Sequence, residues 1–437
     1  MSDTTVSTEA SATAPSPAFA APPGNPRFPL FDGLRGIAVL AVLLLHSSEL
    51  SGRVGLGVGG RLGEAAGGLG VIVFFVISGF LLYRPFAAAR ATGRRRAPLR
   101  LYARRRALRI LPAYWIVLTI LATFPGVFGV FTGHWWRYYG FLQDYFARST
   151  SSGIPVAWTL CVEVTFYLAL PLWAALLARR TSTSRRSFAI AELTPLAAVA
   201  MVGLIIQILA QRHTVPVVLA STLVGESLWF AIGMAIAVLS VVEHGAASRP
   251  AAVNWLSDRP LVYWAVALAA LAGLMVMVPS GGFFGLVASV QQPQPAFQTL
   301  LRLVLEAIVT VGLILPAVFA GRRPGVPRRV IGSRALIGLG VISYSFYLWH
   351  LTIVEFIAGG HTNAFSSTGL NLMAHVHSAR MTVLFLVSLA VAVPISAASY
   401  RLFELPFLRR KERQNVQVRT PSVEERAQPK TPIINAP

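Results

Sequence analysis

The stretch FDGLRGIAVLAVLLLHSS, from Phe31 to Ser48, decides the fold and carries the residue of greatest functional interest. Its length and apolar character are those of a membrane-spanning helix. His46 lies within it, and an ionisable side chain inside a membrane segment is costly to bury, which favours a functional role. Arg35 lies eleven residues earlier, so both side chains are expected on one helix face, roughly 16 Å apart along the axis. With Arg35 at one membrane surface, His46 is predicted near the middle of the bilayer.

Apolar stretches of this kind recur along nearly the whole chain. Of the 437 residues, 55% are hydrophobic and 13% are charged, whereas a soluble globular protein carries about 25% charged residues. The fold class is therefore predicted to be all-α, a polytopic membrane protein with about ten transmembrane helices and the lipid bilayer as its partner. The helices are expected near residues 33–50, 68–88, 104–124, 156–178, 190–211, 216–241, 260–279, 299–320, 335–358 and 380–406.

The positive charges predict the topology. The formal net charge is +21, but the arginines gather in alternate connections between the helices, which is the pattern of a membrane protein and not of a nucleic-acid-binding protein. This asymmetry places both termini, and Arg35, on the cytoplasmic side. The arginine-rich segments are 84–109, 179–186, 249–259, 322–334 and the tail that begins at Arg409.

The two ends of the chain differ in composition from the rest. Residues 1–30 are rich in Ala, Pro, Ser and Thr and lack the pattern of a signal peptide, and residues 409–437 are polar; both are predicted to be disordered tails. Residues 31–408 are predicted to form one transmembrane domain. The single cysteine, Cys161, permits no intramolecular disulfide and is interpreted as a small buried hydrophobic residue.

Six segments together resemble one protein family. They are FDGLRGIAVLAVLLLH, GLGVIVFFVISGFLL, RRRALRILPAYW, WTLCVEVTFYL, ISYSFYLWH and SYRLFELPF, and they look like the successive signatures of the acyltransferase-3 family of bacterial integral-membrane O-acyltransferases. The resemblance runs from Phe31 to Arg410. It implies ten transmembrane helices in the bacterial inner (cytoplasmic) membrane. It also implies transfer of an acyl group, often acetyl, from cytoplasmic acyl-CoA to a carbohydrate or glycoside, with acyl-CoA as donor substrate and no bound cofactor.

His46 and Arg35 match the family's motif of a basic residue, ten spacers and a histidine. An alcohol that attacks a thioester must lose its proton, and a histidine with a pKa near neutrality is the usual base. His46 is therefore predicted to be catalytic. Two alternatives remain open, an imidazole that is itself acylated and a neutral histidine hydrogen-bonded between helices.

The arginines at the start of the third predicted helix are candidates for donor binding. Arg105 and Arg109 are spaced i, i+4 and so share a helix face. Guanidinium groups bind phosphates in bidentate fashion, and the family resemblance implies the same role for this pair, with Arg35 as a third donor-binding residue. The alternative is that these arginines only orient the helix in the membrane.

Glu163 and Tyr167 lie in WTLCVEVTFYL. Where the family often has a second acidic residue and a glutamine, this chain has Val164 and Thr165, which weakens a role that needs paired carboxylates. Glu163 is predicted to belong to the catalytic site, either orienting His46 or contacting the acceptor, because a membrane carboxylate needs a cation or histidine partner. Tyr167, one turn later, is a possible site residue on the same face.

His350, in SYSFYLWH, is the second histidine within a predicted span. Packing and membership of the site are both open for it. Three other residues are interpreted as structural: Ser78 and Gly79 as small residues at a helix contact, and Glu404 as the partner of Arg401 or a neighbouring arginine.

The outer segment 125–157 is rich in aromatic residues, among them Trp135, Trp136, Tyr138 and Tyr139. Such rings suit a membrane–water interface and also stack on sugars, and the first interpretation is favoured. His361, His375 and His377 include a His-x-His pattern, but without a supporting Cys or carboxylate no metal site is predicted. The nucleotide-binding and zinc-protease motifs are not found.

The sequence as a whole therefore predicts an enzyme, a membrane-bound O-acyltransferase. The alternative is a transporter or flippase for a sugar-containing or lipid-linked substrate, because intramembrane His and Glu also suit proton-coupled transport.

Overall fold

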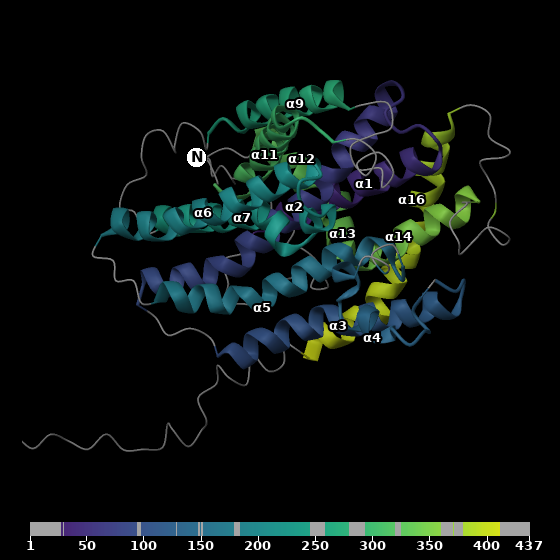
Figure 1. Ribbon diagram of the computed structural model, residues 1–437, viewed down its shortest axis with the longest axis horizontal. Helices are drawn as coiled ribbons and strands as arrows, with labels where there is room; N and C mark the ends of the chain where they lie inside the picture. The colour runs from purple at the N-terminus through teal and green to yellow at the C-terminus, as the bar shows by residue number, and fades with distance from the viewer. Residues whose placement is uncertain are drawn as a thin grey trace, which may run out of the picture.

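In the structure, a computed structural model, the regular elements of the described part of the chain are all helices (Figure 1). The described residues are 28, 30–93, 98–127, 129–146, 149, 152–178, 184–244, 258–278, 293–319, 325–359, 370 and 379–410. The predictions of disorder in both tails fall mostly outside these ranges. Other predictions that lie outside them concern Arg94, Arg95, Arg96, Arg179, Arg180, Arg249, His361, His375 and His377.

The helices follow the predicted spans, except that α2 begins at Gly57, eleven residues before the predicted start at residue 68. Their bounds are α1 Leu30–Leu50, α2 Gly57–Ala91, α3 Leu99–Thr123, α4 Trp135–Tyr139, α5 Trp158–Ala178, α6 Arg185–Gln211, α7 Leu223–His244, α9 Pro260–Met277, α11 Ala296–Val318, α12 Gly325–Ile331, α13 Arg334–Val341, α14 Ser343–Ala358 and α16 Arg380–Ser399. Short 3₁₀ turns lie at Gln143–Tyr145, Pro155–Ala157 and Val217–Ser221, and a π-helical turn, Tyr400–Glu404, follows α16.

The count of about ten spans is confirmed, with one correction. Nine helices of the described chain are long and apolar enough to cross a membrane, and a tenth span is made by α13 and α14 together. These two are bent by 80° at Ile342, so the single helix predicted over 335–358 is wrong. The reason lies in Gly340, where a Cβ atom would be only 1.7 Å from the carbonyl oxygen of Asp32. The end of α13 packs directly on the backbone of α1, and the chain must then turn to cross the bundle.

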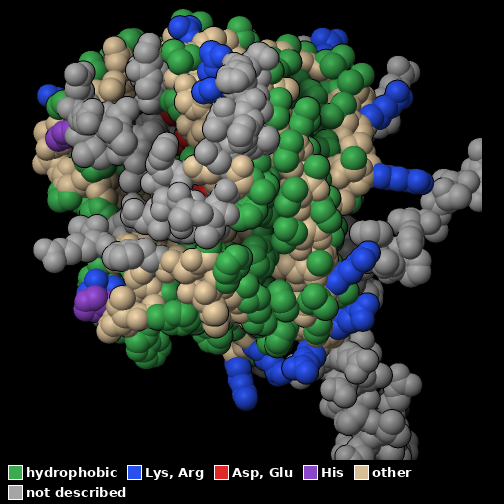
Figure 2. All heavy atoms as spheres, turned by 90° about the vertical axis from the view of Figure 1, so that its right-hand side faces the viewer, with side chains coloured by type: hydrophobic (Ala, Val, Ile, Leu, Met, Phe, Trp, Pro, Cys, Tyr) green, Lys and Arg blue, Asp and Glu red, His purple; other side chains and the backbone are tan. Residues whose placement is uncertain are grey.

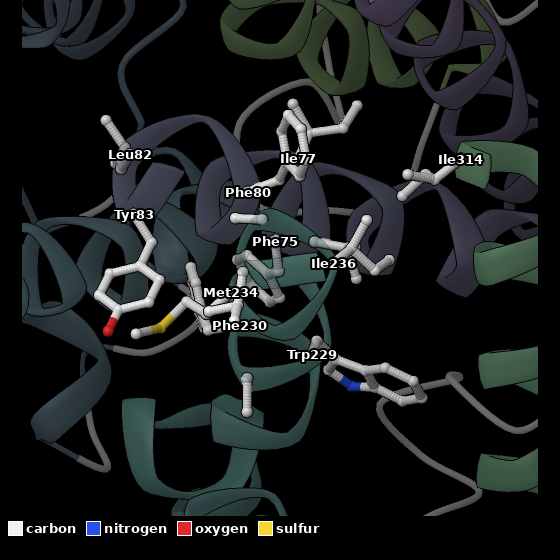
Figure 3. Packing of buried hydrophobic residues seen from close by; sticks show 14 of the residues in the cluster. Phe75, Ile77, Phe80, Leu82, Tyr83, Trp229, Phe230, Met234, Ile236 and Ile314 are labelled. Atoms are coloured by element: carbon white, nitrogen blue, oxygen red, sulfur yellow. The ribbon is translucent and has the colours of Figure 1, made fainter. Parts of the chain in front are cut away.

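Helices α1 and α2 lie at the centre of the bundle, with α9 and α3 at opposite edges in Figure 1. Figure 3 shows Phe75 of α2 beside Phe230 of α7; both are buried, and their ring centres are 4.9 Å apart. This contact is close because both helices use glycine there. A Cβ atom on Gly79 would lie 2.5 Å from the carbonyl oxygen of Phe230, and α7 places a glycine against α2 in the same way. The packing role predicted for Gly79 is confirmed.

A second core lies between α3, α5 and α14. It contains Tyr114, Leu118 and Leu348 together with Cys161, whose side chain is fully buried. The interpretation of Cys161 as a buried small hydrophobic residue is confirmed. This core holds α3 and α5 beside α14, and so fixes three of the helices that surround the candidate site.

The outside of the bundle is apolar, as a lipid-facing surface requires. On α5, for example, Leu168, Leu172 and Leu176 share one face and all are exposed. Figure 2 shows a broad hydrophobic surface on one face, with the Lys and Arg side chains at its edges. Together with the length of the spans, this surface makes the chain a multi-pass membrane protein.

The prediction for Glu404 is wrong. Its carboxylate is buried and contacts the hydroxyl of Ser345, while Arg401 is exposed. The π-helical turn at Tyr400–Glu404 adds a residue to the helix and so shifts the phase of the side chains that follow. Glu404 therefore points into the bundle and not toward the arginine three residues before it.

Candidate functional site

A cavity of about 100 Å³ lies between α1, α2, α3, α5 and α14. We call it the arginine cavity because three arginines line it. The full lining is Arg35, Val42, Val71, Phe74, Phe75, Ser78, Leu81, Leu82, Arg106, Arg109, Ile110, Thr159, Leu160, Glu163, Tyr167, Ser343, Tyr344 and Tyr347. Four residues predicted to belong to the site, Arg35, Arg109, Glu163 and Tyr167, are thus brought together from three helices.

The arginines of the cavity come from α1 and α3. Nη1 of Arg35 lies 2.7 Å from Oδ1 of Asp32, one turn earlier on α1. From α3 come Arg106 and Arg109, and the guanidinium of Arg106 lies 5.9 Å from the ring centre of Tyr167, a cation–π distance. The predicted pair was Arg105 and Arg109, but Arg105 does not line the cavity. The i, i+3 pair faces inward instead of the i, i+4 pair.

Glu163 is the carboxylate of the cavity. Its Oε1 accepts a hydrogen bond from the hydroxyl of Ser78 at 2.9 Å, and its Oε2 accepts one from the hydroxyl of Tyr167 at 2.7 Å. The predicted common face of Glu163 and Tyr167 is confirmed. Glu163 therefore does not orient His46, whose carboxylate partner is a different residue. It supplies one negative charge among three arginines, which leaves the cavity with an excess of positive charge.

The break between α13 and α14 contributes to the same cavity. Ser343 and Tyr344, the first two residues of α14, are part of its lining. The N-terminal end of a helix carries a partial positive charge. Because the first two residues of α14 line the cavity, α14 brings this charge to the cavity wall. Farther along α14, Tyr347 and Thr159 of α5 form a hydroxyl–hydroxyl hydrogen bond of 2.8 Å that bridges the two helices.

The two membrane histidines lie side by side. The ring centres of His46 and His350 are 5.3 Å apart, and we call these two residues the histidine pair. Nδ1 of His46 lies 2.7 Å from Oε2 of Glu49, with 15% and 26% of the two side chains exposed. Since a carboxylate only accepts, the bond fixes a proton on Nδ1 and leaves Nε2 of His46 as the basic nitrogen.

His350 is far more buried than His46, with 1% of its surface exposed. Its Nδ1 donates to the backbone carbonyl of Tyr347 at 2.7 Å, so Nε2 carries the lone pair. The ring stacks on Phe346, with centres 6.0 Å apart. The structure places His350 beside His46, and its membership of the site stays a prediction.

The histidine pair lies beyond one end of the arginine cavity. On α1 the cavity touches Arg35 and Val42, and His46 is one turn past Val42 on the same helix face. On α14 the cavity touches Tyr347, and His350 follows three residues later, with the two rings 6.0 Å apart. The cavity and the pair thus follow one another along the same two helices. His46 itself lies four residues before the end of α1, and not at its middle.

Three site residues were missed from the sequence. Ser78 was assigned to packing, yet it hydrogen-bonds Glu163 and lines the cavity. Arg106 was hidden in a run of three arginines. Glu49 stood three residues after His46, a spacing that places both on one helix face, and this signal could have been used. Among the described residues, no group of three metal-ligating side chains is found.

The outer segment after α3 supplies one further titratable group. Asp144, in the turn Gln143–Tyr145, is fully buried, and no described residue hydrogen-bonds its carboxylate oxygens. Burial raises the pKa of Asp144 to about 7. In the same segment Trp135 and Trp136 of α4 are exposed, which suits either the membrane interface or a sugar. Asp144 does not line the arginine cavity.

Comparison with known proteins gives one family. The sequence model of the acyltransferase-3 family, described as an acyltransferase domain, matches residues 29–401. The acyltransferase MdmB of Streptomyces mycarofaciens is 25% identical over 417 residues, which are 89% of this chain and 93% of that protein. The O-acetyltransferase OatA of Staphylococcus aureus is 28% identical over 174 residues, 36% of this chain and 26% of that protein. The match thus spans about a quarter of the OatA relative. No solved structure matches the chain.

Proposed function

Because the chain belongs to the acyltransferase-3 family and is an acyltransferase, we propose that it moves an acyl group from acyl-CoA to a hydroxyl of a carbohydrate or glycoside. Acetyl is the first candidate for the acyl group, since OatA is named an O-acetyltransferase. The acyl-CoA is a substrate and enters from the cytoplasm. The membrane is the bacterial inner membrane.

One observation carries this proposal: the arginine cavity leads along α1 and α14 to the histidine pair. A CoA donor has phosphates at one end and a thioester at the other. Its phosphates fit Arg35, Arg106 and Arg109, because guanidinium groups bind phosphate oxygens in bidentate fashion. The apolar part of the lining, such as Phe74 and Leu160, suits the pantetheine arm. The thioester then lies toward His46.

His46 is proposed to act as general base. Its Nε2 takes the proton of the acceptor hydroxyl while that oxygen attacks the thioester carbonyl carbon. The new C–O bond forms, the C–S bond breaks, and the CoA thiolate leaves and takes the proton back from His46. Glu49, bonded to Nδ1 at 2.7 Å, holds the ring and stabilises the imidazolium that forms. A covalent route through an acylated imidazole uses the same residues.

Glu163 has a different place in this proposal. Its two hydrogen bonds to Ser78 and Tyr167 fix a negative charge beside the arginines. Such a charge attracts the guanidinium groups and offsets their mutual repulsion, which orders them before the donor arrives. Glu163 is thus proposed to position the donor-binding arginines, and it does not take part in proton transfer.

The bend between α13 and α14 also favours a second candidate. Discontinuous helices whose N-terminal ends face an anionic substrate occur in transporters, and α14 presents such an end to the cavity. In this version the chain carries an anionic or sugar-bearing substrate across the membrane. The two functions are distinguished by chemistry, because only the transferase releases free CoA thiol.

The test compares wild-type protein with a His46→Ala variant at equal membrane abundance. Free thiol released from acetyl-CoA is measured in membranes, and envelope glycans and secreted glycosides are analysed by mass spectrometry. We expect thiol release and an added ester mass that only the wild type produces. Thiol release that the variant retains in full would contradict the role of His46. Absence of both signals in folded wild-type protein would favour transport.

A further inference from the structure

The second histidine of the pair has an unused acceptor in a buried position. His350 is 1% exposed, and no described residue hydrogen-bonds its Nε2. A buried polar atom without a partner costs roughly 1–3 kcal/mol, so native proteins rarely keep one without a reason. A different side chain, such as leucine, would fill this space without that cost. The presence of a histidine at this position therefore indicates that its Nε2 accepts a hydrogen bond from a ligand.

The tautomer of His350 is determined by hydrogen bonds to the backbone of its own helix. Nδ1 lies 2.7 Å from the carbonyl oxygen of Tyr347 and 3.2 Å from that of Phe346. Carbonyl oxygens only accept, so Nδ1 holds the proton and Nε2 is an acceptor. The hydrogen bond that Nδ1 of His46 donates to Glu49 gives His46 the same tautomer. The two neighbouring rings, with centres 5.3 Å apart, thus both have Nε2 as their acceptor nitrogen.

A pair of acceptors requires a ligand with two donors. We propose that Nε2 of His350 accepts a hydrogen bond from a second hydroxyl of the acceptor substrate, next to the hydroxyl that His46 deprotonates. Hydroxyls on neighbouring carbons are close enough to bond two rings at this separation. The acceptor is therefore a compound with adjacent hydroxyl groups. This inference rests on the proposed function, and it narrows the acceptor group from any hydroxyl of a carbohydrate or glycoside to one with a neighbouring hydroxyl.

During transfer the two hydroxyls have different fates. The first loses its proton to His46, forms the ester bond to the acyl carbon and releases CoA as free thiol. The second keeps its proton and donates it in a hydrogen bond to His350. His350 is therefore an acceptor-binding residue, and its loss should lower the preference for a diol.

The experiment uses two small alcohols as probes with purified full-length protein and acetyl-CoA. Ethane-1,2-diol and propan-1-ol have equal numbers of non-hydrogen atoms, but only the first has a second hydroxyl. Ester formation is measured by gas chromatography with mass spectrometry, and kcat/KM is expressed per hydroxyl. We expect the wild type to prefer the diol by about tenfold, the effect of one well-placed hydrogen bond.

Two substitutions at His350 separate its two nitrogens. His350→Asn keeps a donor near the position of Nδ1 and removes the acceptor, so the diol preference should fall to about onefold. His350→Gln places its amide oxygen near the position of Nε2 and should keep most of the preference. His134→Asn changes an exposed histidine at the start of α4 and is the matched control, with the preference unchanged. Thermal stabilisation by free CoA verifies that each variant is folded.

The outcomes are distinguishable. Equal diol preference in wild type and His350→Asn would overturn the inference and leave the proposed function intact, and so would a wild type that does not prefer the diol. Loss of the preference in a folded His350→Gln protein would also contradict it. If the wild type esterifies neither alcohol and releases no thiol, the proposed function fails, and the inference fails with it.

Discussion

The arginine cavity and the histidine pair share α1 and α14, but they are built in opposite ways. In the cavity, three permanent cations surround one carboxylate that already has two hydrogen bonds. In the histidine pair, both rings are held by hydrogen bonds at their Nδ1 atoms, and no described residue hydrogen-bonds Nε2 of His350. Under the proposed function, the groups that bind the donor and the groups that transfer the proton thus lie at different positions along α1 and α14. Substitutions in the two regions should therefore affect different kinetic constants.

The largest expected effect is in the histidine pair. His46→Ala removes the base and should lower turnover by about 10²–10⁴-fold, while affinity for CoA stays close to that of the wild type. Thiol release and CoA binding, measured on the same membranes, check the two halves of this statement. A parallel loss of CoA affinity would show that the two regions are not separate.

The next effect is in the cavity and tests which face of α3 binds the donor. Arg106→Gln should weaken acyl-CoA affinity by about 10–100-fold, because it removes a charged hydrogen-bond donor, whereas Arg105→Gln should change it by less than about threefold. Isothermal titration with CoA measures both variants. Equal losses of affinity from the two substitutions would show that donor binding does not depend on which arginine lines the cavity. The total positive charge at the start of α3 would then explain the affinity.

A smaller effect is expected from the carboxylate on His46. Glu49→Gln keeps a hydrogen-bonding group but removes the charge that stabilises the imidazolium, so kcat should fall by about tenfold. The KM for acyl-CoA should not change. Glu49→Asp, which retains the charge on a shorter side chain, should recover part of the rate. A wild-type kcat in the Gln variant would remove Glu49 from the mechanism.

The smallest effect lies outside both regions. Burial raises the pKa of Asp144 to about 7, whereas an unfolded aspartate has a pKa of about 3.9. The folded state therefore binds the proton more tightly, so the contribution of Asp144 to stability is greatest below about pH 4 and is lost as the pH rises to about 7. Between these values the wild type should lose about 2–4 °C in Tm relative to Asp144→Asn. Thermal unfolding of both proteins in detergent at pH 4 and pH 7 checks this. An equal Tm difference between wild type and Asp144→Asn at the two pH values would contradict it.

Much of the fold could be predicted because hydropathy and arginine placement act over whole spans. The bend at Ile342 could not, because it depends on how closely Gly340 approaches Asp32, a contact between distant parts of the chain. The orientation of the termini remains a prediction. The burial of Glu404 could not be predicted either. It follows from the π-helical turn at Tyr400–Glu404, and no residue pattern in the sequence predicts such a turn.

The candidate site was predictable where a residue stands alone in an apolar stretch. Arg35, Glu163 and Tyr167 are such residues, and all line the cavity. The choice between Arg105 and Arg106 was not predictable, because a run of three arginines carries no information on which face turns inward. The roles of these residues stay predictions. What the structure adds is their grouping into two regions.

The bend at Ile342 has a consequence for how this cavity tolerates mutation. It brings the first turn of α14 to the cavity wall, and the positive potential there comes from aligned peptide groups. No side-chain substitution removes peptide groups, so this contribution persists when one arginine is replaced, and together with the two remaining arginines it outweighs the single charge of Glu163. Descendants of this sequence can therefore exchange those arginines one at a time, and each intermediate still has a positively polarised cavity in which a new cation can be selected.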